Sequence, residues 1–194
     1  MHAPRINFVE PLNLCPWAAP SLAAQGAVQY VHTPASSVED FVKIISSEAE
    51  SLLRRGDDVD VNTAITFIVA PCFEPESFPE FYDFVVWLDE EYLESASPPS
   101  EYLSEDEDCR LGDFVIAAGF HPLWSYSGED PSAPVHFEKR SPFPTVSLVY
   151  ASAIDGLEAS TIKIGEHNRK VLTELGEEKV QQMYSDVIGD NAST

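Results

Sequence analysis

Three reactive side chains in this sequence each stand close to a proline. Cys15 and His121 directly precede a proline, and Arg140 lies two residues before another. Proline disfavours the helical conformation in the residue before it, so we expect these side chains in loops at the ends of apolar runs. A thiol, an imidazole and a guanidinium suit nucleophilic attack, proton transfer and anion binding. The sequence therefore predicts that Cys15, His121 and Arg140 surround one cavity.

Two kinds of chemistry are open to this trio. A Cys15 thiol within hydrogen-bond reach of the His121 imidazole would give covalent catalysis. Alternatively, Cys15, His121 and a further donor such as His136 or His167 would hold a transition metal with an open coordination position. In both versions Arg140 would bind an anionic substrate through paired hydrogen bonds. We expect an enzyme that acts on a small anionic molecule by thiol or metal chemistry.

The same residues also have structural interpretations. Most free cysteines are small hydrophobic core residues, and a histidine at a strand end can be a hydrogen-bonded core residue. Arg140 can form an ion pair in a chain with 33 acidic and 11 basic residues. Cys72 follows an expected strand and Cys109 lies in the acidic segment, so both are expected to be structural or incidental. The spacing of the three cysteines matches no zinc pattern.

The candidates for contacting a substrate are polar side chains near these loops and aromatic side chains that would form apolar walls. They are Asn13, Ser141, Asn168, Trp17 and Trp124. Asn168 stands on an otherwise apolar helix face. It is therefore either a buried anchor for a loop carbonyl or part of the pocket floor.

Four fragments of the chain, taken in order, resemble a known family. They are Asn13-Leu14-Cys15-Pro16-Trp17-Ala18, Phe120-His121-Pro122, Arg140-Ser141-Pro142-Phe143-Pro144, and Glu166-His167-Asn168 with Leu175-Gly176 after it. They are similar to the motifs of DUF1415, a family of domains of unknown function from bacteria, algae and plants. The family pattern has Phe where this chain has Trp17, Asn in place of Lys139 and Arg in place of His167. The resemblance implies a shared pocket without implying a reaction.

The chain is strongly acidic, with a net charge of −22. Such a charge argues against nucleic acid and anionic membranes as partners. Nine acidic and no basic residues lie between Leu88 and Cys109, and residues 95–109 are expected to be an exposed, mobile insertion. This surface suggests the alternative function, a non-catalytic binding or accessory module that docks a basic partner.

Cysteine usage and the lengths of the apolar runs limit the cellular location. Three cysteines cannot form a closed set of disulfides, which favours a reducing compartment such as the cytoplasm or an organellar stroma or matrix. No run approaches the roughly 20 apolar residues of a membrane span, and residues 1–7 lack the apolar core of a secretory signal. The sequence leaves open the oligomeric state and the removal of an organellar targeting peptide.

Hydrophobic periodicity predicts four strands and several helices in one domain. The strands are expected at residues 27–32, 63–70, 114–120 and 145–150, and the helices at 5–13, 38–55, 78–92, 164–175 and 177–188. Ser36 or Ser37 is expected to cap the helix at 38–55, Ser77 is expected to cap the helix at 78–92, and residues 189–194 are expected to form a frayed tail. We expect an α+β fold, a ferredoxin-like layer of about four strands with helices on one face, with a three-layer α/β fold as the alternative.

Overall fold

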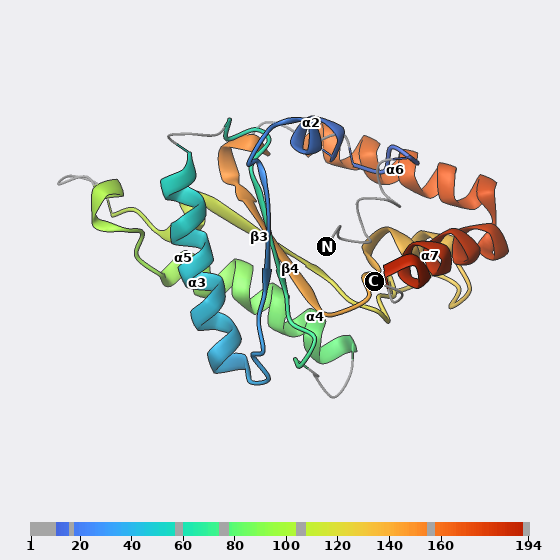
Figure 1. Cartoon of the computed structure of the whole chain (residues 1–194), viewed down its shortest axis with the longest axis horizontal. Coiled ribbons are helices and arrows are strands. Elements are labelled where there is room, and N and C mark those ends of the chain that lie inside the picture. Colours follow the sequence, from blue (N-terminus) through green and yellow to red (C-terminus); the bar gives the residue numbers. More distant parts are fainter. Residues whose placement is uncertain are drawn as a thin grey trace.

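One four-stranded sheet organises the protein, as the α+β prediction expected (Figure 1). The computed structural model describes residues 11–15, 18–56, 60–73, 78–103, 108–154 and 158–191. The strands are β1 (Val28–His32), β2 (Ile65–Val69), β3 (Val115–Phe120) and β4 (Thr145–Tyr150). Each lies within the residues where the sequence predicts it, because the alternation of apolar residues fixes strand positions well.

The order of the strands is β1-β2-β4-β3. β1 and β2 are parallel neighbours, and the other two contacts are antiparallel. In a ferredoxin-like layer another strand lies between the two parallel strands of the βαβ unit. Here β1 and β2 pair directly and β4 joins on the far side of β2, so the sheet is mixed.

Helix α3 (Val38–Arg55) connects β1 to β2 and covers one face of the sheet. The Ser37 hydroxyl accepts a hydrogen bond from the Asp40 N–H at 3.2 Å, as expected for a helix cap. The buried side of the helix carries Phe41, Val42, Ile45, Ala49, Leu52 and Leu53. These residues pack with Ile68 of β2 and Leu148 of β4 in the main core.

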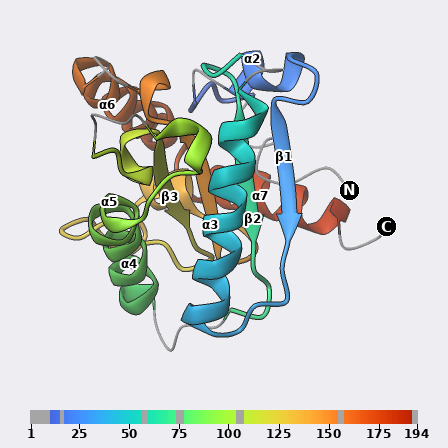
Figure 2. The same cartoon turned by 90° about the vertical axis from the view of Figure 1, so that its left-hand side faces the viewer.

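Helix α4 (Phe78–Trp87) lies on the same face as α3 (Figure 2). It runs on as a π-helical turn, η1 (Leu88–Tyr92), and a short helix, α5 (Leu93–Ser95). The expected cap Ser77 lies outside the described residues. α4 buries Phe81, Phe84 and Val85, so the two helices and this face of the sheet enclose an aromatic core.

The π-helical turn places a carboxylate at the edge of the sheet. Asp89 Oδ1 accepts a hydrogen bond from the backbone N–H of Ala117 at 2.8 Å. Ala117 belongs to β3, which is an edge strand, so Asp89 satisfies a backbone donor that no neighbouring strand reaches. Burial raises the pKa of Asp89, with a smaller contribution from Glu90 and Glu94 that the Ala117 hydrogen bond opposes.

The raised pKa of Asp89 predicts that Asp89→Asn stabilises the protein at neutral pH. The folded state holds this proton more tightly than the unfolded state, so the free energy of unfolding falls as pH rises from the unfolded pKa to the folded pKa. Asparagine keeps the acceptor for Ala117 without this loss. We expect a gain of at most about 1 kcal/mol at pH 7, since Asp89 is only partly buried. Urea unfolding at several pH values measures it. If the stability gain from Asp89→Asn persisted below about pH 3.9, the ordinary aspartate pKa, the raised pKa of Asp89 would not be its cause.

The acidic segment packs on the protein more closely than the sequence predicted. Its 3₁₀ turn, η2 (Ser100–Tyr102), places the Tyr102 hydroxyl where it donates to the Leu53 carbonyl at 2.8 Å. Pro98 and Pro99 are buried, and Glu101 pairs with Arg54 at 3.0 Å. The expectation of a fully exposed insertion is therefore wrong for Pro98, Pro99 and Tyr102, since the prolines are buried and the tyrosine packs against the main core, whereas Ser100 and Glu101 are exposed. Residues 104–107 lie outside the described part.

A second group of helices lies on the other side of the sheet (Figure 1). It comprises α2 (Ala18–Ala23), α6 (Glu158–Leu175) and α7 (Glu177–Asn191). Gly176 separates α6 from α7 with a φ of 78°, a conformation that favours glycine. Helices therefore cover both faces of the sheet. Those that form the main core, α3 and α4, lie on one face.

α6 and α7 pack against a 3₁₀ turn, η4 (Pro134–Lys139), that leads into β4. Leu14, Phe137, Leu172 and Val180 form a small second core there. The remaining 3₁₀ turns are η3 (Leu111–Asp113) and η5 (Ala151–Ala153). No helix of the described residues is long and apolar enough to cross a lipid bilayer.

The ends of the chain are described only in part. Of the helix predicted at residues 5–13, the structure describes residues 11–13, which form a turn. The predicted tail begins inside α7, which reaches Asn191, and residues 192–194 lie outside the described part.

Candidate functional site

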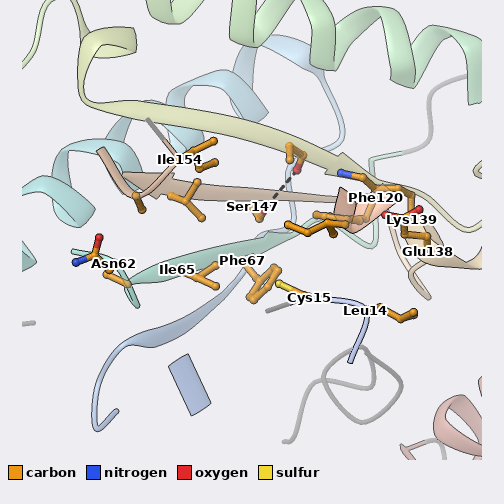
Figure 3. Close-up of a pocket in the computed structure, with 15 residues that line it drawn as sticks. Leu14, Cys15, Asn62, Ile65, Phe67, Phe120, Glu138, Lys139, Ser147 and Ile154 are labelled. Carbon is orange, nitrogen blue, oxygen red and sulfur yellow. Dashed lines mark hydrogen bonds between the residues drawn. The ribbon is translucent and has the colours of Figure 1, made fainter. Parts of the chain in front are cut away.

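A cavity of about 240 Å³ lies against the sheet face opposite α3 and α4 (Figure 3). Alternate residues of three strands form its floor, namely Ile65, Phe67, Ala118, Phe120, Ser147 and Val149. Successive side chains of a strand point to opposite faces. The strands β2, β3 and β4 therefore contribute one set of residues to the main core and the other set to this cavity.

The walls of the cavity come from segments distant in sequence. Leu14 and Cys15 contribute to these walls, as do Glu138 and Lys139 of η4. The remaining wall residues are Asn62, Ala64, Ala153, Ile154 and Ile164. In Figure 3 Asn62 and Ile154 lie at the end away from Glu138 and Lys139. The described lining is mainly apolar; Glu138 and Lys139 lie at one end, and the Cys15 sulfur points toward the Phe67 ring (Figure 3).

Asn168 connects two of the segments that line the cavity, the one with Leu14 and the one with Glu138. It is 1% exposed, and its Nδ2 donates to the Leu14 carbonyl and to Glu138 Oε1, both at 2.8 Å. The Tyr126 hydroxyl donates to the other Glu138 oxygen at 3.3 Å. Of the two interpretations of Asn168, the structure shows the buried anchor. It fixes the segment before Cys15 to the turn that carries Glu138.

Lys139 is the positively charged residue of the lining that the structure describes, and the sequence patterns do not single it out. Its Nζ lies 4.5 Å from the centroid of the Phe120 ring and 5.8 Å from that of Trp124. A cation over an aromatic face is attracted by the ring quadrupole. The family pattern has Asn at this position, so the motif by itself does not indicate a role for the Lys139 side chain. Its position beside Arg140 in the motif was the signal available.

His121 lies on the opposite side of the sheet from the cavity. The Phe120 side chain points into the cavity, so the next residue points the other way. The His121 ring lies 5.0 Å from the ring of Phe81 and 5.6 Å from that of Phe78, both on α4. Its Nδ1 accepts a hydrogen bond from the Leu123 N–H at 3.1 Å, which holds the turn. Burial lowers its pKa, which favours the neutral form of the ring.

Arg140 also faces away from the cavity. Its Cζ lies 4.3 Å from the centroid of the Phe137 ring, and its Nε donates to the Trp124 carbonyl at 3.4 Å. Burial lowers its pKa, and Tyr184 and Glu177 of α7 act in the opposite direction. The structure therefore does not bring Arg140 or His121 to the cavity that Cys15 lines.

The other predicted residues are spread around these loops. The Ser141 hydroxyl is buried and donates to the Phe143 carbonyl at 2.6 Å. Trp124 is buried against Phe78 of α4. Asn13 is exposed with a φ of 50°, and Trp17 lies outside the described residues. None of the first three lines the cavity.

His136, the third metal candidate, is buried with both ring nitrogens engaged. Nδ1 accepts from the Tyr126 N–H at 3.1 Å, and Nε2 lies 2.8 Å from the Asp130 carbonyl, to which it donates. His167 is exposed on α6. Within the described ranges, no three His, Cys, Asp or Glu side chains are grouped so that they could hold a metal ion. The metal version of the site therefore gains no geometric support from this part of the chain.

Comparison with known proteins gives a family and no characterised relative. No curated protein and no solved structure matches the chain. The sequence profile described as Protein of unknown function (DUF1415) matches residues 6–182, a span that includes the cavity's lining and all four motifs. The chain therefore belongs to the DUF1415 family.

Proposed function

We propose that the protein binds a small, mainly apolar molecule in the cavity on the second face of the sheet, and that the Cys15 thiol is its reactive group. The observation that carries this proposal is that Cys15, from the first family motif, borders a mainly apolar cavity of about 240 Å³. Ligand sites of proteins are typically apolar hollows with a few convergent polar groups. Cys15, Glu138 and Lys139 are the convergent groups here.

The proposed site retains the Cys15 thiol, but its neighbours differ from those that the sequence suggested. The sequence suggested His121 as the base and Arg140 as the anion clamp, and both side chains lie elsewhere. Lys139 supplies a positive charge in the same cavity as Cys15, and the Asn168 hydrogen bond to the Leu14 carbonyl holds the backbone next to Cys15. Thiol chemistry on the bound molecule therefore depends on the cavity and not on a Cys15–His121 pair.

Filling the cavity tests the proposal. A neutral, environment-sensitive apolar dye should bind the protein, and Ile164→Trp should weaken binding by about tenfold or more by occupying the space. Ile162→Trp is the matched control, since it adds the same indole two residues away on α6 at a site that is 66% exposed. It should change the dissociation constant by less than about twofold. Fluorescence titration measures both.

The thiol is tested in the same system. In a Cys72→Ser, Cys109→Ser background, bound dye should slow alkylation of Cys15 by a maleimide, measured by mass spectrometry. His121→Ala should leave the alkylation rate nearly unchanged, because its ring packs against α4. The proposal would be contradicted if Ile164→Trp left the dissociation constant of the dye unchanged. It would also be contradicted if bound dye left the alkylation rate of Cys15 unchanged.

The alternative function, docking of a basic partner, would use a different surface. Glu90, Glu91 and Glu94 are exposed and form no ion pair with another described residue. Such docking would weaken steeply with salt. This alternative would be favoured by a basic partner that no longer binds the double variant Glu90→Gln, Glu94→Gln and that binds the Ile164→Trp variant with unchanged affinity.

A further inference from the structure

We infer, on the basis of the proposed function, that the ligand is a compact, flat molecule with an N–H or O–H group that donates a hydrogen bond to the Ser147 hydroxyl on the floor of the cavity. Ser147 is then a residue that determines the specificity of the site. Two observations carry the inference: the hydrogen bonding of the Ser147 side chain and the sizes of the side chains around it.

Ser147 is the polar residue of an otherwise apolar floor. It belongs to β4, which lies between β2 and β3 in the sheet, so its side chain lies within the floor and not at its margin (Figure 3). It is 7% exposed. Burying a hydroxyl among apolar groups costs free energy unless the hydroxyl is hydrogen-bonded, so a serine at this position requires a partner.

The partner that the structure gives to Ser147 is a weak one. Its hydroxyl donates to the Ala118 carbonyl at 3.4 Å, whereas bonds between a hydroxyl and an oxygen are usually about 2.5–3.0 Å long. A hydroxyl also has two acceptor lone pairs, and no described residue donates to Ser147 Oγ. A hydroxyl that already donates is a better acceptor, since linked hydrogen bonds polarise one another. A ligand N–H or O–H would supply the missing donor.

The floor is low at Ser147 and higher around it. Ala118 and Phe67 lie directly opposite Ser147, on β3 and β2 respectively. Phe120 and Val149 lie two residues further along β3 and β4 and therefore on the same face. Two small side chains thus lie next to each other with larger ones around them. Two phenylalanines at the border of this hollow favour a flat aromatic ligand, because aromatic rings pack well on one another.

The small side chain of Ala118 is not a requirement of the main core. Its neighbour Gly119 faces that core, and a Cβ added there would lie 2.7 Å from a methyl group of Val85. Ala118 points the other way, into the cavity. The cavity of about 240 Å³ is smaller than the sites of drug-sized ligands, about 300–1,000 Å³. The free space over Ala118 and Ser147 therefore suits a compact ring system.

Indole and benzofuran test the inference, because they share one bicyclic shape and differ in an N–H against an oxygen. Both compete with the neutral dye, first on the unmodified protein and then on Ser147→Ala. The affinity of indole divided by that of benzofuran should fall by about three- to tenfold in Ser147→Ala, the net value of one hydrogen bond. Comparing this ratio between two proteins cancels the difference in hydration of the two compounds.

Two further variants serve as control and as a test of position. Ser46→Ala removes a half-buried hydroxyl that donates to the Val42 carbonyl within α3, on the other side of the sheet, and should leave the ratio unchanged. Ala118→Leu fills the hollow and should weaken binding of both compounds by about tenfold or more. Circular dichroism confirms that the variants are folded.

The possible outcomes separate this inference from the proposed function. If Ser147→Ala leaves the ratio unchanged, or weakens both compounds equally, no ligand donor contacts Ser147 and the inference is wrong. It is also wrong if Ala118→Leu leaves both affinities unchanged, or if the dye binds and indole does not. In each of these cases dye binding that is sensitive to Ile164→Trp still supports the cavity. If neither the dye nor indole binds, the proposed function itself is wrong.

Discussion

Asn168→Asp is expected to lower the free energy of unfolding by about 3–5 kcal/mol at pH 7, because it places an uncompensated charge in a buried position. The Asn168 amide donates to the Leu14 carbonyl and to the Glu138 carboxylate. A carboxylate of nearly the same shape can donate to neither, and it would repel Glu138. Urea unfolding followed by circular dichroism measures the loss.

Two further variants define what this loss means. Asn62→Asp makes the same chemical change at an exposed position on the far side of the cavity and should cost less than about 1 kcal/mol. Asn168→Leu removes the donors without adding charge, and should cost about 1–3 kcal/mol for the unsatisfied Leu14 carbonyl. Equal losses for Asn168→Asp and Asn62→Asp would show that Asn168 is not the buried anchor.

Phe81→Ala is expected to lower the free energy of unfolding by about 3–5 kcal/mol, the usual cost of truncating a buried phenylalanine. Phe81 is fully buried, and its ring lies 6.5 Å from that of Phe73, 6.4 Å from that of Phe84 and 5.0 Å from that of His121. The truncation leaves a cavity between α4 and the sheet that these rings cannot fill. Chemical unfolding measures this loss.

Tyr82→Ala on the same helix is the control, because Tyr82 is 48% exposed. It should cost clearly less, about 1 kcal/mol for its ring contacts with neighbouring aromatic residues. The His121 titration gives a second readout: burial lowers its pKa in the intact protein, so opening the space beside its ring should raise that pKa toward about 6.5. An unchanged His121 titration would indicate that the ring is buried by other groups.

The local elements follow from the sequence with little help from the rest of the protein. The strand from Thr145 to Tyr150 begins and ends where its apolar residues do. Helix α3 begins after Ser37, whose side chain caps it. Both signals come from neighbours along the chain, hydrophobic periodicity in one case and a single hydrogen bond in the other. The role of Asn168 as an anchor is similar, since a lone amide on an apolar helix face needs a buried partner.

The composition of the site depended on contacts that the sequence does not display. A proline follows closely after each of Cys15, His121 and Arg140. Cys15 nevertheless borders the cavity, whereas His121 packs on α4 and Arg140 packs on Phe137. One residue step along a strand reverses the direction of a side chain. Phe120 therefore enters the cavity and His121 enters the opposite layer, a difference that proximity to a proline cannot reveal.

The sequence by itself determined the four strands, the main helices and the α+β class, and it pointed to the loops around Cys15, His121 and residues 139–144 as candidates for a site. Only the tertiary structure decided the strand order, the packing of Tyr102 of the acidic segment on α3 and the presence of Cys15, Glu138 and Lys139 in the lining of one cavity. The physical reason is the range of the forces involved. Periodicity and capping act within a few residues, whereas the cavity forms where α6 and its Asn168 side chain join segments more than 100 residues apart.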